Sequence, residues 1–268
     1  MTTSQPRDPA PDATPFPEEP PPPEEPAFLP PPPRHRWGFG AFLLVEVVLL
    51  ASAAFISALV GDTGPGPLPM RVVLLGTMLP TMIAAGVAVL ITFVRGNGPV
   101  LDLRLEWRWA DVKTGFRFGC VGLVFTTFGA YLWTQLVGNA NATSAISALV
   151  EDRKMSVSAA VVMFVYLWLL GPICEEIIYR GLLWGAAEQL QWRSERWGRV
   201  AAFLLTTAVF AASHLEPLRT TLLLVIAVPI GLARLVTGRL PGSIVAHQVN
   251  NFLPALTILL GALGVASF

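Results

Sequence analysis

The chain has 268 residues, of which 53% are hydrophobic and 13% charged, and its 18 basic side chains balance its 18 acidic ones. Soluble domains are far less apolar than this, and a net charge of zero gives no basis for binding a nucleic acid. The composition therefore predicts a protein embedded in the lipid bilayer.

The first 36 residues differ in composition from the rest of the chain. They carry proline runs with interspersed glutamates, as in PFPEEPPPPEEPAFLPPPP. Such a segment has too few apolar side chains to offset the entropy lost on ordering. We expect residues 1–36 to form a disordered cytoplasmic tail, with a docking site for a proline-binding partner as the alternative. Residues 37–268 are expected to form one transmembrane helical bundle.

Long apolar segments recur from Trp37 almost to the end of the chain. A bilayer is crossed by a helix of about 20 residues, which most of these segments reach. They predict an all-α fold, a polytopic bundle of about seven transmembrane helices, at residues 37–61, 70–95, 113–137, 156–188, 198–214, 218–237 and 240–264. The fourth segment exceeds what a bilayer requires, and the fifth is close to the minimum length.

Basic side chains gather in alternate connections between these segments, and this pattern indicates the orientation in the membrane. On one side they are Arg34, Arg36, Arg95, Arg104, Arg108, Lys113, Arg193, Arg196, Arg199, Arg234 and Arg239. The positive-inside rule places this side and the N-terminus in the cytoplasm, and the C-terminus outside. Tryptophans near the expected interfaces would form an aromatic belt, namely Trp37, Trp107, Trp109, Trp192 and Trp197.

Three charged residues lie within the fourth apolar segment, in the stretch GPICEEIIYRG. Charge inside a bilayer is costly and must be compensated. Glu176 and Arg180 are one helical turn apart, with the acid first, so we expect them to form an ion pair. Glu175 has no basic partner one turn away. A buried ion pair that only holds helices together is the structural alternative to a functional site.

Four further residues extend this polar set across other apolar segments. Phe210 and His214 in FAASH are one turn apart, and so are His247 and Asn251 in HQVNN. A carboxylate with a histidine can deprotonate water, and a histidine with an amide can stabilise an oxyanion. The set is consistent with hydrolysis of an acyl bond, although spacing does not decide whether Glu175 or Glu176 is the base.

The three motifs, EEIIYR, FAASH and HQVNN, resemble those of the CPBP family of CaaX-prenyl-protease and bacteriocin-processing intramembrane endopeptidases. Its pattern of Glu-Glu-x-x-x-Arg, Phe-x-x-x-His and His-x-x-x-Asn is matched in order and without substitution. The resemblance covers roughly residues 156–264, the expected protease core. It implies an enzyme that hydrolyses a peptide bond in a membrane-associated protein or peptide, with no particular oligomeric state and no prenyl requirement indicated.

The resemblance implies a role for each motif residue. Glu175, assisted by His214, would activate the attacking water, and His247 with Asn251 would stabilise the oxyanion. Glu176, Arg180 and Phe210 would support the site. Apart from the resemblance, the chain has no His-Glu-x-x-His helix and its histidines lie on different segments, so we expect catalysis without a metal. The family is also called a metalloprotease family, and Glu175, His214 and His247 could instead bind zinc.

The sequence leaves one alternative function open, and one charged residue lies outside the motifs. A non-catalytic membrane scaffold or a proton-coupled transporter could use the same buried polar residues, and is the alternative to an enzyme. Glu46, in the first segment, matches no motif. We expect its carboxylate to extend toward the cytoplasmic interface.

Overall fold

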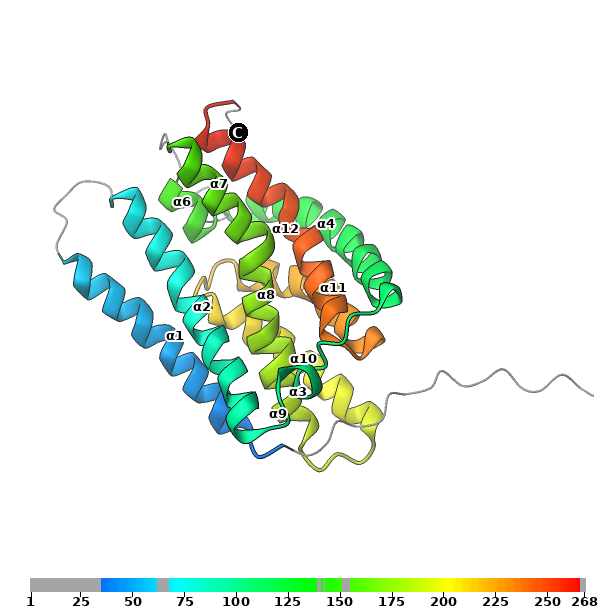
Figure 1. The fold of residues 1–268 in the computed structure, drawn as a ribbon. Coiled ribbons are helices and arrows are strands. Elements are labelled where there is room, and N and C mark those ends of the chain that lie inside the picture. Colours follow the sequence, from blue (N-terminus) through cyan, green and yellow to red (C-terminus); the bar gives the residue numbers. More distant parts are fainter. Residues whose placement is uncertain (1–34, 62–67, 139–140, 142, 151–154, 266–268) are drawn as a thin grey trace, which may run out of the picture. The chain divides into compact units, whose positions relative to one another are not determined.

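The computed structural model describes residues 35–61, 68–138, 141, 143–150 and 155–265, and every regular element in these ranges is helical (Figure 1). The expectation of an all-α fold is confirmed. The described residues belong to one compact unit, Pro32–Phe268. The expected disordered tail falls almost entirely outside them.

The helices begin and end close to the predicted boundaries. In chain order they are α1 (Phe39–Val60), α2 (Met70–Arg95), α3 (Pro99–Asp102), α4 (Trp109–Val137), α6 (Ala145–Val150), α7 (Val157–Val165), η1 (Tyr166–Leu170), α8 (Gly171–Glu176), η2 (Ile177–Leu183), α9 (Trp184–Glu188), α10 (Glu195–Ser213), α11 (Thr220–Thr237) and α12 (Leu240–Ala262).

Within the described residues, six helices are long and apolar enough to cross a membrane, so the chain is a multi-pass membrane protein. The continuous helix Val157–Glu188, with 32 residues, is one of them. The expected fifth span is present as α10 but does not count among the six. Its first turns carry Glu195, Arg196 and Arg199, which leave too short an apolar stretch.

Backbone and ionic contacts bring several connections together at one end of the bundle. The Arg36 amide donates to the Arg95 carbonyl at 2.8 Å, and the Leu240 amide to the Arg104 carbonyl at 3.1 Å. The Arg104 guanidinium lies 3.4 Å from Glu188 at the end of α9. These contacts join connections that the distribution of basic residues places on the same side of the membrane. Which side of the membrane this is stays a prediction.

The expected aromatic belt is wrong for Trp37. Trp107, Trp109 and Trp197 are exposed, but Trp37 is only 3% exposed. Its indole N–H donates to Asp102 at 3.0 Å, and its ring stacks on His35. A buried hydrogen-bond acceptor on α3 therefore holds this residue inside the protein.

The site helix Val157–Glu188 packs in the bundle against α2, α10 and α12 (Figure 1). Glycines allow α4 to lie directly on α12, because a Cβ at Gly115 would stand 2.3 Å from the Gly242 carbonyl oxygen, and one at Gly119 would stand 2.8 Å from that of Ala246. Small residues permit such close packing in membranes. This packing fixes the N-terminal half of α12, which carries His247.

Two π-helical turns, η1 and η2, flank the short helix α8. At the end of η1 the Gly171 amide donates to the Tyr166 carbonyl, five residues earlier. Pro172 follows, and it has no amide hydrogen to continue the α-helical pattern. Such widened turns occur often at functional sites. The wider turns rotate the residues of GPICEEIIYRG about the helix axis relative to a regular α-helix. Spacing rules for an α-helix do not predict this rotation.

Candidate functional site

The Glu176 carboxylate lies at the centre of the polar cluster. Its Oε1 atom is 3.1 Å from the Arg180 guanidinium, and both side chains are 0% exposed. The ion pair expected from their spacing is therefore present and completely buried. Arg180 also lies over the Phe210 ring, 4.3 Å from its centroid.

His247 joins the two glutamates. Its Nδ1 atom lies 3.0 Å from Glu176 Oε1, and its Nε2 atom lies 3.7 Å from Glu175 Oε2. The imidazole is almost fully buried, whereas the Glu175 side chain is 26% exposed. Glu176 thus orients the ring, and Glu175 combines contact with the ring and access to a reactant.

Phe210 packs between the two histidines. Its ring centroid lies 4.8 Å from that of His214 and 5.6 Å from that of His247. Phe210 therefore forms a wall of the site, in contact with the His214 side chain that the FAASH spacing places one turn away.

His214 lies at the end of α10 and is exposed. Its Nδ1 atom lies 2.8 Å from the Phe210 carbonyl oxygen, to which it can donate, leaving Nε2 as an acceptor. Among the described residues, no ion pair within 4.0 Å joins His214 to Glu175. The structure therefore places His214 beside the site through Phe210 and not through direct contact with the glutamate.

The two asparagines of α12 have different partners. The Asn251 amide donates to the Leu167 carbonyl in η1 at 3.3 Å, so one of its two N–H donors is used. The buried Asn250 faces α4 and accepts from the Thr126 hydroxyl at 2.7 Å. Asn251 therefore faces the site helix at η1, and Asn250 serves helix packing.

The described ranges contain no group of three His, Cys, Asp or Glu side chains arranged to hold a metal ion. Glu175 and His247 lie close together, but His214 does not complete the set. The alternative zinc ligands Glu175, His214 and His247 therefore do not fit a metal in this arrangement.

The structure adds two residues that the sequence motifs do not assign to the site. Glu46 in α1 does not extend to the interface as expected, because its Oε1 atom is buried inside the protein. Its side chain interacts instead with the hydroxyl group of Tyr179 in η2. The sequence feature that could have indicated Tyr179 is its position one turn after Glu175, which places both side chains on the same side of the helix.

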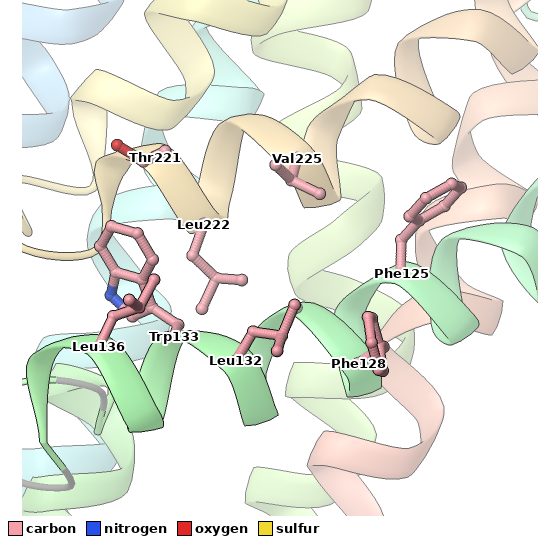
Figure 2. Close-up of a pocket in the computed structure, with 9 residues that line it drawn as sticks. Phe125, Phe128, Leu132, Trp133, Leu136, Thr221, Leu222 and Val225 are labelled. Carbon is pink, nitrogen blue, oxygen red and sulfur yellow. The ribbon is translucent and has the colours of Figure 1, made fainter.

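An apolar pocket of about 310 Å³ lies between α4 and α11 (Figure 2). It is lined mainly by aromatic and aliphatic side chains, including Phe125, Phe128 and Leu132 from α4 and Leu222 from α11. The Trp133 indole donates to the Leu218 carbonyl at 2.9 Å. None of the polar cluster residues lines this pocket, so it is separate from the candidate site.

Comparison with known proteins identifies a related family over the segment that holds the polar cluster. Residues 157–253, which contain all seven predicted site residues, match the family model described as type II CAAX prenyl endopeptidase Rce1-like. No curated protein and no solved structure gives a significant match. The matched segment, which runs from α7 into α12, is therefore a domain of the Rce1-like endopeptidases within the CPBP family, a family of peptidases.

Proposed function

We propose that the chain is an intramembrane endopeptidase that cleaves a membrane-associated protein or peptide with a water molecule activated by Glu175. The family match over the segment that holds the site carries this proposal. The contacts of Glu175 with His247, and of His247 with Glu176, support it.

Glu175 is the general base. It is the more exposed of the two glutamates, and no basic side chain of the described residues lies in ion-pair distance apart from His247. Glu176 is committed to Arg180 and His247. Glu175 therefore takes a proton from water, whose oxygen bonds to the carbonyl carbon of the substrate. The proton then passes to the leaving nitrogen as the C–N bond breaks.

His247 and Asn251 stabilise the negative charge that develops on the carbonyl oxygen. Glu176 accepts from Nδ1 of His247, which leaves Nε2 directed toward the Glu175 side. A protonated His247 donates from both ring nitrogens. Asn251 supplies its second N–H donor, and His214 assists Glu175 by accepting a hydrogen bond from the attacking water at Nε2. Donors held in place before the reaction are the most effective ones.

The experiment is cleavage of a fluorogenic apolar peptide by the purified full chain in liposomes, with lipidated and unlipidated versions of the peptide. We expect cleavage by wild type and by the Glu106→Ala control, which removes an exposed glutamate outside the site. Glu175→Ala should be inactive, and Asn251→Ala should be slower by about 100-fold. Cleavage by Glu175→Ala at the wild-type rate would contradict the proposal.

The liposomes also test the competing function. A proton-coupled transporter would move protons across the membrane without cutting the peptide. Proton movement with no peptide product from the wild-type protein would favour that alternative.

A further inference from the structure

One face of α1 packs against the site helix, although α1 lies outside the segment that matches the family. Phe42 and Val45 are the buried residues of α1, and Leu49 packs on the same cluster. Positions 42, 45, 46 and 49 share one helical face. Glu46 therefore lies on the face of α1 directed into the protein.

Tyr179 is the residue of η2 that meets this face. Its ring lies 6.1 Å from that of Phe42, one turn before Glu46, in an edge-to-face arrangement. Its hydroxyl group interacts with the Glu46 carboxylate and with the Ser213 hydroxyl. Glu46 Oε1 is buried and has no hydrogen-bond partner among the described residues. Among the described residues, no basic side chain forms an ion pair with Glu46. A carboxylate buried in the membrane without such a partner lowers stability, so packing alone does not explain its presence.

Tyr179 in turn contacts the wall of the site. Its ring packs edge-to-face on Phe210, with centroids 5.4 Å apart. Phe210 touches both His214 and His247. Tyr179 also follows Glu175 by four residues, about one helical turn. A side chain that holds the Tyr179 ring in place therefore also restrains the Phe210 ring, which contacts both histidines.

From these contacts we infer that Glu46 is a positioning residue of the peptidase site, which acts by holding the hydroxyl group of Tyr179. The inference rests on the proposed function, and it adds a contribution from α1 to a site otherwise built from residues 157–253. Glu46 touches neither the water nor the substrate in this role.

The test is a double-mutant cycle in the liposome assay, with kcat, KM and the melting temperature measured for each variant. We expect Glu46→Leu and Tyr179→Phe each to lower kcat by about tenfold or more while KM changes little, since each removes one partner of a buried polar pair. The double variant should be no slower than the slower single variant. Glu46→Gln should keep most of the activity, because its amide oxygen still accepts from the tyrosine.

A matched control is Ser52→Ala, which removes a polar side chain of α1 that bonds only its own helix. It should leave kcat unchanged. Wild-type kcat in Glu46→Leu, additive losses in the double variant, or equal losses in Glu46→Gln and Glu46→Leu would each overturn the inference. If Glu46→Leu does not fold, Tyr179→Phe decides alone, and wild-type kcat in that variant overturns it.

These outcomes are separable from the failure of the proposed function. An inactive Glu175→Ala variant together with a fully active Glu46→Leu variant overturns only the role of Glu46. Activity in Glu175→Ala overturns the proposed function itself.

Discussion

Removing Arg180 should destabilise the protein strongly. The Arg180→Ala change leaves the Glu176 carboxylate at 0% exposure without its guanidinium partner, and His247 is then its remaining ion-pair neighbour among the described residues. Glu176 Oε2 already has no hydrogen-bond partner within the described part of the chain. Breaking a completely buried pair by removing one member costs about 3–5 kcal/mol.

This loss can be read as a shift in the melting temperature. For a chain of this size, about 1 kcal/mol corresponds to about 2–4 °C, so the expected shift is roughly 6–20 °C. The assay is thermal unfolding of the purified protein in detergent, followed by tryptophan fluorescence, together with the yield of folded protein. Activity should fall with it, because Glu176 orients His247.

Two further variants separate charge from volume. Arg180→Met keeps most of the side-chain volume but leaves Glu176 uncompensated, so it should be nearly as unstable as Arg180→Ala. Arg108→Ala breaks an exposed pair with Glu106, at 3.5 Å, and should cost less than about 1 kcal/mol. A normal melting temperature and yield for Arg180→Ala would refute the reasoning.

Three further predictions concern pH, topology and metal. Burial lowers the pKa of His35 from its ordinary value of 6.5. The unfolded chain then binds the proton more readily, so burial of the neutral His35 ring should favour folding above that pH and less so below it. A melting curve measured as a function of pH should show this loss, and His35→Asn should lack it. A reporter fused after Arg193 should be cytoplasmic and one after Arg153 external, by the positive-inside rule; the opposite result would reverse the orientation. Thoroughly chelated protein should keep its peptidase activity, since Glu175, His214 and His247 do not converge as three ligands in the described ranges. Loss of activity that stoichiometric zinc restores, with bound zinc in elemental analysis, would contradict this.

Local features of the fold and site could be predicted from the sequence. The helices follow from long apolar runs, and the Glu176–Arg180 pair follows from their spacing of one turn. The contact between Phe210 and His214 follows in the same way. In each case the partners lie on one helix, so no knowledge of packing is needed.

Contacts between distant segments could not be predicted in the same way. His247 and Glu176 are 71 residues apart, and only the packing of α12 on the site helix brings them together. The interaction of Glu46 with Tyr179 likewise depends on which face of α1 is buried, and the apolar sequence around Glu46 shows no amphipathic pattern that would reveal it.

One error and one difference in detail have local physical causes. The position of Trp37 before an apolar run predicts an interfacial residue, but Asp102 provides a buried acceptor for its indole. The expected fifth membrane span is a helix, but its charged first turns shorten its apolar part. The widened turns η1 and η2 could not be predicted either, because they depend on backbone geometry that residue spacing does not reveal.

The rate of peptide cleavage by Glu175→Gln, relative to wild type in the same liposomes, tests the central claim most directly. Glutamine keeps the size of the side chain but cannot take a proton from water. We predict that the rate falls by at least about 100-fold, with an unchanged melting temperature. Cleavage by Glu175→Gln at a rate close to that of wild type would contradict the account.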